Sequence, residues 1–487
     1  MSYSLGAVVL VSAGLAVAGL AAVAGGGRAE AVTIYPAPRG EQLSTLFTLR
    51  VEGRRAPVYQ AKVAPADPAS RWRAMDNPAT SANYYAKAAF AIFDMRRPVR
   101  VEVGSREPVR SVRILPTSLG IQPRVRGRTV TFTLAAPRPV TVEVNGDWVG
   151  VLHIFANPPE TDVPSPDDPN VIFFGPGIHE VTRKVVTSGQ TVYVAGGAVV
   201  RTVVGPDEPY TINPRSGLRS YAPTFELRGS GIQFRGRGIV DASACPTHAR
   251  NMILVRGSDI TIEGVVLRDS SVWTMPIRES DRVTVRNVKI IGRRANSDGI
   301  NICNSRDVLV EDCFIRTLDD LVVVKTDKGV GKAARIVVRR CVLWNEVAHA
   351  LSVGAELRED VDDVLFEDSD IIRDRGREWT LRVFHSDAAT VSNIRFVNLR
   401  IEESPRLASV WIGRAMWSRD PERGRVRGVL FRDIVAKADP LRIELVGYDA
   451  DKAVEDVVFQ NVVVNGRPLT RADVTANAYV RGVRVTP

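Results

Sequence analysis

The sequence predicts an all-β chain in which a parallel β-helix, or solenoid, follows a small antiparallel β-sandwich. A strand motif of alternating apolar residues recurs at steps of 23, 25, 28, 28, 30, 35 and 28 residues, and its units begin at Asp259, Arg282, Asp307, Arg335, Asp363, Asn393, Gly428 and Asp456. Strand-like units at such a period, with insertions of variable length, are typical of a β-solenoid. Leucine-rich repeats share the period, but their Leu frame is missing here. Propeller blades need about 40–45 residues each.

The segment over residues 32–163 has a different pattern and predicts the sandwich. Short runs of alternating apolar residues, over 99–103, 129–133 and 140–144, are separated by turn residues, and Asn145-Gly146 is a strong hairpin signal. A Pro-rich stretch then leads into the solenoid, which we expect over residues 164–487. We expect the sandwich to cap and stabilise the solenoid, with glycan binding as the alternative.

The first 31 residues predict a signal peptide. Residues 5–24 are almost wholly apolar, and Ala29-Glu30-Ala31 fits a signal-peptidase site. The prediction is therefore a secreted or periplasmic protein with no stable membrane association after cleavage. A retained membrane anchor is the alternative, because the apolar run is long and no Lys or Arg precedes it.

Composition limits the partners and cofactors. A hydrophobic content of 45% and a charged content of 25% are those of a soluble globular protein. The net charge of +10 is spread over arginines interspersed with acids, without a basic block that contains aromatics, so we expect no nucleic-acid partner. No His or Cys cluster has metal-ligand spacing, and we expect no metal and no cofactor. We interpret the four cysteines as small apolar residues of the stack: Cys245, Cys303, Cys313 and Cys341.

Three carboxylates are predicted to meet on consecutive coils. Aligning residues 300–302 with 322–324 places Asp298 over Asp320, with Asp319 beside them, and the next coil brings His349 into the same column. Clustered carboxylates repel, so at least one should keep a proton near neutral pH. An acid beside bases is what the hydrolysis of a glycosidic bond requires.

These residues resemble the motifs of the polygalacturonase family, glycoside hydrolase family 28, and of its clan relatives, the family 49 dextranases and isopullulanases. The similarity lies in Asn296-Ser297-Asp298, in Asp319-Asp320 and in the segment around His349. The resemblance implies a right-handed parallel β-helix and hydrolysis with inversion. It implies that Asp319 is the general acid, that Asp298 and Asp320 activate water, that His349 positions the acid, and that Asn296 orients the first carboxylate.

The sequence departs from the family at a position that contacts substrate. The family's Arg-Ile-Lys motif is closest to Arg382-Val383-Phe384, so a Phe replaces the Lys that would meet a uronate. Further candidates for substrate binding are Lys325, which ends the Asp319-Asp320 strand, and Trp273, one of four tryptophans that could stack on sugars, with Trp344, Trp379 and Trp411.

The leading hypothesis is a secreted inverting glycoside hydrolase that cleaves a neutral polysaccharide in the manner of a dextranase. A polygalacturonase is the second hypothesis. A polysaccharide lyase, which would need a Ca²⁺ site and a basic proton abstractor, and a non-catalytic glycan-binding solenoid remain open.

Overall fold

In the computed structural model, which describes residues 30–487, each repeat unit forms a short strand bounded by two residues with positive φ. The first residue of every unit has φ between 53° and 68°, and the sixth residue has φ between 43° and 84°. Asp, Asn and Gly tolerate this left-handed conformation best, and they fill most of these positions. The exceptions are Arg282, Arg335 and Arg340, and each forms an ion pair with an Asp of the preceding coil. What recurs from unit to unit is therefore a pair of left-handed corners in the backbone.

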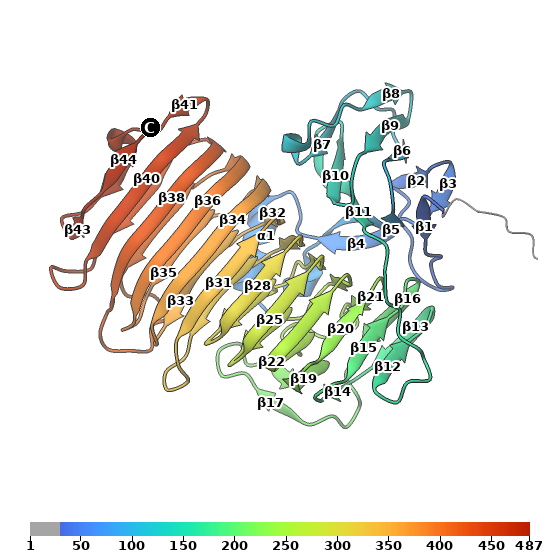
Figure 1. The fold of residues 1–487 in the computed structure, drawn as a ribbon, viewed down its shortest axis with the longest axis horizontal. Helices are drawn as coiled ribbons and strands as arrows, with labels where there is room; N and C mark the ends of the chain where they lie inside the picture. The colour runs from blue at the N-terminus through green and yellow to red at the C-terminus, as the bar shows by residue number, and fades with distance from the viewer. Residues whose placement is uncertain (1–29) are drawn as a thin grey trace, which may run out of the picture.

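The solenoid has three faces of parallel strands, which continue from coil to coil (Figure 1). The first face contains β14 (Lys184–Val186), β19 (Phe225–Ser230), β22 (Ile253–Glu263), β24 (Met275–Arg278), β27 (Ile300–Cys303), β30 (Val322–Thr326), β33 (Leu351–Leu357), β35 (Leu381–His385), β37 (Ala408–Ile412), β39 (Ile443–Val446) and β42 (Thr475–Ala476). The second face contains β12 (Val171–Phe174), β15 (Thr191–Val194), β20 (Gln233–Gly236), the end of β22, β25 (Asp281–Arg286), β28 (Arg306–Glu311), β31 (Ala333–Arg339), β34 (Val361–Asp374), β36 (Thr390–Ser404), β38 (Arg425–Ala438), β40 (Val454–Val464), β43 (Val480–Arg481) and β44 (Arg484–Thr486).

The third face contains β13 (Gly177–Val181), β16 (Ala198–Thr202), β21 (Ile239–Asp241), β23 (Val266–Arg268), β26 (Lys289–Ile291), β29 (Phe314–Thr317) and β32 (Val342–Asn345), and it continues into the end of β34. The short strand β41 (Arg467–Pro468) pairs with the end of β40. The predicted right-handed parallel β-helix is thus the observed architecture.

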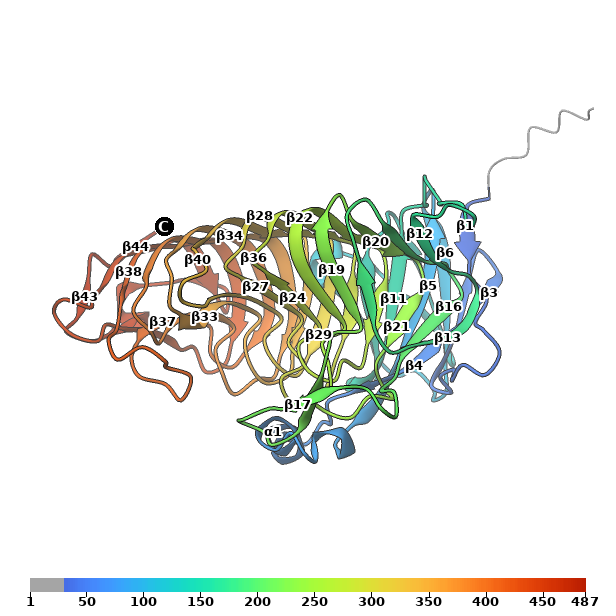
Figure 2. The same cartoon turned by 90° about the horizontal axis from the view of Figure 1, so that it is seen from below.

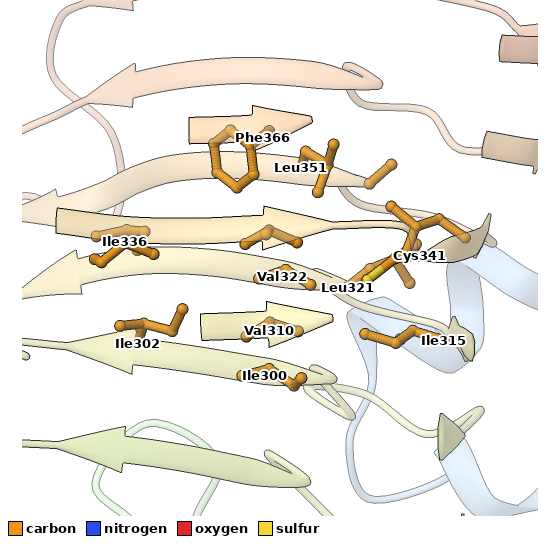
Figure 3. Packing of buried hydrophobic residues seen from close by; sticks show 14 of the residues in the cluster. Ile300, Ile302, Val310, Ile315, Leu321, Val322, Ile336, Cys341, Leu351 and Phe366 are labelled. Atoms are coloured by element: carbon orange, nitrogen blue, oxygen red, sulfur yellow. The ribbon is translucent and has the colours of Figure 1, made fainter. Parts of the chain in front are cut away.

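Stacked apolar side chains fill the inside of the solenoid (Figure 3). Ile300, Val322 and Leu351 are paired on successive strands of the first face and have no exposed surface. Cys313 and Cys341 lie in the same core, as the interpretation of the cysteines required. Cys245 and Cys303 are also buried but lie outside this core, and all four cysteines are free.

Two sheets form the N-terminal part, as expected. One sheet contains β1 (Val32–Ile34), β4 (Tyr59–Val63), β5 (Ala86–Met95), β7 (Val112–Leu115), β10 (Pro139–Val144) and β11 (Asp147–Asn157); the other contains β2 (Phe47–Val51), β3 (Arg54–Ala56), β6 (Val99–Ser105), β8 (Arg124–Arg126) and β9 (Thr129–Leu134). They share one core, and β10 and β11 form the predicted hairpin with positive φ at Asn145 and Gly146. Pairing is antiparallel except between β5 and β11, which are parallel.

The N-terminal sheets pack against the third face of the solenoid. Phe90 and Phe155 of the sheets share a buried cluster with Phe314 and Trp344 of the solenoid. Buried ion pairs cross the same interface, among them Arg237–Asp94 at 3.0 Å. The N-terminal sheets therefore do not cover the first face.

Two insertions, which the sequence did not predict, flank the first face. Between β4 and β5 the chain forms α1 (Pro68–Asp76) and the short 3₁₀ helix η1 (Ser81–Asn83), and between β16 and β19 it forms the hairpin β17 (Tyr210–Ile212) and β18 (Arg219–Tyr221). Two further 3₁₀ turns are η2 (Thr117–Leu119) and η3 (Arg471–Asp473). Figure 2 shows α1 and β17 on the same side of the solenoid.

The predicted signal peptide falls almost wholly within residues 1–29, which lie outside the described residues. None of the helices in residues 30–487 has the length and apolar character needed to cross a membrane. The boundary predicted at residue 163 lies in the strand-free stretch between β11 and β12, and it remains a prediction.

Candidate active site

Parallel pairing brings Asp298, Asp320 and His349 into one column at the start of three neighbouring strands. Ile300 pairs with Val322, as the sequence alignment predicted, and Val322 pairs with Leu351. The backbone N–H of Gly299 donates to the carbonyl of Asp320 at 2.8 Å, and that of Leu321 donates to the carbonyl of His349 at 2.9 Å. The catalytic candidates are therefore one strand spacing apart.

The three carboxylates form a tight, buried cluster. Asp298, Asp319 and Asp320 are 1%, 7% and 6% exposed, and one oxygen from each lies within 4.8 Å of the others. Oδ1 of Asp319 accepts a hydrogen bond from the backbone N–H of Asp320 at 2.9 Å, and its Oδ2 accepts one from Nδ2 of Asn296 at 3.2 Å.

The contact of Asn296 corrects one expectation. It was predicted to orient the first carboxylate, but the group that donates to Asp298 is Asn301, with Nδ2 2.6 Å from Oδ2. Asn301 lies between two core isoleucines of β27 and therefore points outward, because side chains alternate along a strand. The sequence signal for the outward position of Asn301 was a polar residue between two apolar residues of a strand.

Lys325 supplies the positive charge within the cluster. Its Nζ lies 3.7 Å from Asp298 Oδ2, 3.9 Å from Asp320 Oδ2 and 3.5 Å from Glu356 Oε2. The same ammonium lies over the ring of Trp273, 4.6 Å from its centroid. Lys325 and Trp273 therefore both lie beside the carboxylates, and their role in substrate binding stays a prediction. Glu356 is a member of the cluster that the sequence did not reveal.

His349 links the carboxylates to Arg382. Its Nδ1 is 2.6 Å from Asp320 Oδ1, and its Nε2 is 3.0 Å from Nη1 of Arg382. The same guanidinium binds Glu378 at 3.0 Å, so Arg382 already has a carboxylate partner within the protein. It also lies on the ring of Phe384, 3.8 Å from the centroid.

Burial and mutual repulsion separate the acidities of the three carboxyl groups. Burial raises the pKa of Asp298 to about 7, with Lys325 opposing and Asp320 adding to the rise. Burial, together with the charges of Asp298 and Asp320, holds the pKa of Asp319 well above its usual value. Burial alone would raise the pKa of Asp320, yet His349 and Lys325 outweigh it and bring that pKa below its usual value. The cluster therefore contains a protonated acid beside an ionised base.

Several buried polar atoms around the carboxylates have no partner within the described chain. They are Ser297 Oγ, Asp298 Oδ1, Asn301 Oδ1 and Ser352 Oγ. Folded proteins seldom leave such atoms unsatisfied, so an unsatisfied group points to water or a ligand. These atoms are suited to hold water and sugar hydroxyls beside the acid.

Two further tryptophan candidates lie near the site, and a third is buried in the interior. Trp411 packs edge-on against Phe384 at 5.2 Å, and Trp379 precedes β35 by two residues, in the column of His349. Trp344 is fully buried between the solenoid and the N-terminal sheets, over Arg316 at 4.1 Å, so the suggestion that it stacks on a sugar is wrong.

The three carboxylates are close enough together to bind a metal ion, but a lysine ammonium lies against them. Three carboxylate oxygens this close could coordinate a cation, but the ammonium of Lys325 lies against two of them and compensates their charge. The residues therefore fit acid–base chemistry with Lys325 as the resident cation.

Comparison with known proteins identifies the family. The model of glycosyl hydrolases family 28 matches residues 224–473, which hold all the site residues described above. The chain belongs to glycosyl hydrolase family 28.

One curated protein and two solved structures are among those similar to this chain. A probable polygalacturonase of Vitis vinifera is 28% identical over 123 residues, which span 24% of this chain and only 25% of the relative. The structure of Dex49A from Penicillium minioluteum is similar over 93% of this chain and 96% of its own, with a TM-score of 0.53 at 14% identity. An exopolygalacturonase from Thermotoga maritima covers 64% of this chain and 84% of its own, with a TM-score of 0.49 at 16% identity. The likeness to Dex49A extends the shared fold over both the N-terminal sheets and the solenoid.

Proposed function

We propose that this family 28 hydrolase cleaves glycosidic bonds with inversion, using Asp319 as the general acid and Asp298 with Asp320 as the groups that activate water. The observation that carries the proposal is the difference between the surroundings of the two adjacent aspartates. Asp320 is held ionised by His349 and Lys325, whereas Asp319 lies between two other carboxylates and keeps its proton. A protonated carboxyl group can donate to the leaving oxygen while an ionised one accepts a proton from water.

Inversion is proposed because two carboxylates are available to hold the water. In most inverting enzymes the acid and base are about 6.5–9.5 Å apart, which is wider than the spacing in this cluster. Asp298 and Asp320 nevertheless form a pair beside the acid, and Oδ1 of Asp298 has no partner within the described chain. Proton NMR of the first product anomer tests this point, and net retention would contradict it.

The charges at the site favour a neutral sugar over a uronate. Five carboxyl groups lie at the site, those of Asp298, Asp319, Asp320, Glu356 and Glu378, and its cations Lys325 and Arg382 are bound to them. A substrate carboxylate would therefore meet excess negative charge and no unpaired cation among these residues. Phe384 and Trp411 offer an apolar face instead.

A neutral polysaccharide in the manner of a dextranase is the proposed substrate, and galacturonan is the second candidate because a curated relative is named a probable polygalacturonase. Export remains part of the proposal and rests on the predicted signal peptide. A panel of dextran, pullulan, arabinan, galactan and polygalacturonate, read by new reducing ends, tests the substrate class. Hydrolysis of polygalacturonate alone would overturn the neutral-sugar proposal. An increase in ultraviolet absorbance without hydrolysis would indicate a lyase.

A further inference from the structure

The positive charge of the protein is concentrated in its N-terminal sheets. Residues 32–157 contain 18 Lys and Arg against 9 Asp and Glu, a formal charge of +9. Residues 158–487 contain 46 Lys and Arg against 45 Asp and Glu, a formal charge of +1. Nearly all of the net charge of +10 therefore lies outside the catalytic solenoid, and the proposed reaction does not use it.

Four exposed arginines of the sheets differ from Arg282 and Arg335 of the solenoid. On the solenoid, Arg282 and Arg335 bind Asp259 and Asp307 through two nitrogens each. In the N-terminal sheets no carboxylate of the described residues lies within 4.0 Å of the exposed guanidinium groups of Arg100, Arg124, Arg126 and Arg138. Their charge is therefore available to a partner.

These arginines line one depression, which we call the basic groove, with a volume of about 1230 Å³. It is lined by residues of β6, β8 and β9 and of the connections beside them, and no Asp or Glu is among the lining residues. Arg124 pairs with Thr131, and Arg100 pairs with Thr133, so these side chains share one face of the sheet. Two acids adjoin the groove: Glu102 pairs with Thr131 from the other side, and the carboxylate of Glu52 accepts from the backbone N–H of Arg100.

We propose that the basic groove binds an acidic polysaccharide, a chain of sugars that carry carboxylates. A guanidinium matches a carboxylate through two parallel hydrogen bonds, and the threonine hydroxyls can bond to sugar hydroxyls. Nucleic acid fits less well, because proteins that bind single strands stack bases on exposed aromatics. Phe132, the aromatic residue of this lining, is only 4% exposed. The groove anchors the enzyme to an acidic polymer while the catalytic site acts separately.

Binding to polygalacturonate in an affinity gel at moderate salt tests the groove. A variant with R100Q, R124Q and R126Q should lose at least tenfold in affinity, and D319N should bind as the wild type does. The control variant R282Q, R335Q and R425Q removes the same charge from the solenoid and should retain its affinity within about twofold. Equal losses of affinity in the two triple variants would show that only the net charge of the protein matters, and this would overturn the proposal. Tighter binding of a single-stranded oligonucleotide than of polygalacturonate would also overturn it.

A second inference rests on the proposed function and on a different observation, the contact between Arg215 and Trp417. Arg215 is in the turn between β17 and β18, and its guanidinium lies 4.7 Å from the ring centroid of Trp417, in the loop after β37. Ser216 in the same turn contacts Nδ1 of His248 at 3.1 Å. In the same loop as Trp417, Nη1 of Arg419 donates to Oδ1 of Asp327, a residue that follows β30, at 2.9 Å.

The two contacting segments come from opposite edges of the catalytic sheet. The hairpin leads into β19 at the edge where strands start, and the loop leaves β37 at the edge where strands end. The strands β22, β24, β27, β30, β33 and β35 lie between β19 and β37 in the sheet, and their inner side is filled by core. The segments therefore meet over the outer side, above the strands that carry the carboxylates, which agrees with the small exposure of Asp319 and Asp320.

We infer that this contact blocks one end of the substrate path, so that the enzyme cuts near a chain end and releases short products. Wild-type enzyme on its polysaccharide should produce reducing ends with little fall in viscosity. W417A and R215A should increase the fall in viscosity per bond cleaved several-fold, whereas M416A, in the same loop and 83% exposed, should not. A rapid fall in viscosity with wild type would overturn the inference and leave the proposed hydrolysis intact. Absence of reducing ends on every polysaccharide of the panel would instead count against the proposed function.

Discussion

The imidazole of His349 lies between Asp320 and Arg382, and this fixes where its proton resides. A guanidinium can only donate, so Nε2 of His349 accepts from Arg382 at 3.0 Å, and Nδ1 carries the proton. Nδ1 therefore donates to Oδ1 of Asp320 at 2.6 Å, which favours the ionised form of that carboxyl group. The proposed assignment of the two adjacent aspartates, with Asp319 as the acid, rests on this arrangement.

Replacement of the acid is the most direct test. Asp319→Asn removes the transferable proton while keeping the shape of the side chain, and general acid catalysis contributes about 10²–10⁴-fold. We expect kcat to fall by at least that factor, with unchanged folding by circular dichroism and unchanged glycan binding. The control is Asp307→Asn, a half-buried residue that pairs with Arg335 outside the site, and this variant should keep its activity. Activity near that of the wild type in Asp319→Asn would exclude this residue as the acid.

His349→Gln tests the positioning of Asp320. Loss of the imidazole should raise the pKa of Asp320, so the acidic limb of the pH profile of kcat/KM should shift to higher pH. The alkaline limb, which depends on Asp319, should move less. His179→Gln, far from the site in β13, should leave both limbs in place. A uniform fall in rate without a shifted limb would mean that His349 acts only on structure.

Asp298 should make the protein less stable as pH rises. Its pKa is about 7 in the folded protein against an ordinary value of 3.8, so between these values the folded state holds a proton that the unfolded chain releases. The free energy of unfolding should therefore fall as pH rises from about 4 to about 7. Asp298→Asn should show a smaller fall, measured by chemical denaturation at pH 5 and pH 8, and a variant parallel to the wild type would contradict this. Asp319 and Asp374, whose pKa values are also raised, keep part of the dependence in both proteins.

Phe384→Lys tests the preference for a neutral sugar. A cation at this position restores the charge that the family motif carries, while the apolar contact with Trp411 is lost. The ratio of kcat/KM for polygalacturonate to that for a neutral glycan should rise about tenfold or more. Phe384→Leu is the matched control, because it removes the ring without adding charge. The same change of ratio in both variants would show that charge does not set specificity here.

The aromatic stack inside the second face should dominate the stability of the last coils. Phe396 lies 5.1 Å from Phe366 and 4.9 Å from Phe431, with nearly parallel rings, and is fully buried. Phe396→Ala should lower the free energy of unfolding by about 3–5 kcal/mol. Denaturant titration measures the loss, and Phe396→Leu should lose clearly less. A loss below about 1 kcal/mol would show that the coils rearrange to fill the cavity.

The solenoid and the register of its catalytic column could be predicted because each coil repeats one local requirement. Asp, Asn and Gly mark the left-handed corners, and the corners fix which residues start each strand. Once the strands are in register, Asp298 and Asp320 must be neighbours. The insertion containing α1 and the approach of Glu356 and Glu378 to the site could not be predicted. The insertion and Glu378 lie outside the strands of the repeat, and Glu356 lies where the register of β33 shifts.

The sequence by itself therefore determined the β-helix, the stacking of the carboxylates and the family to which the chain belongs, since these depend on local backbone preferences repeated at a regular period. Only the tertiary structure decided that His349 contacts Asp320 rather than Asp319, that Asn301 rather than Asn296 holds Asp298, and that Arg215 of the hairpin meets Trp417. These features arise from burial and from contacts between residues far apart in the chain, which no periodic pattern encodes.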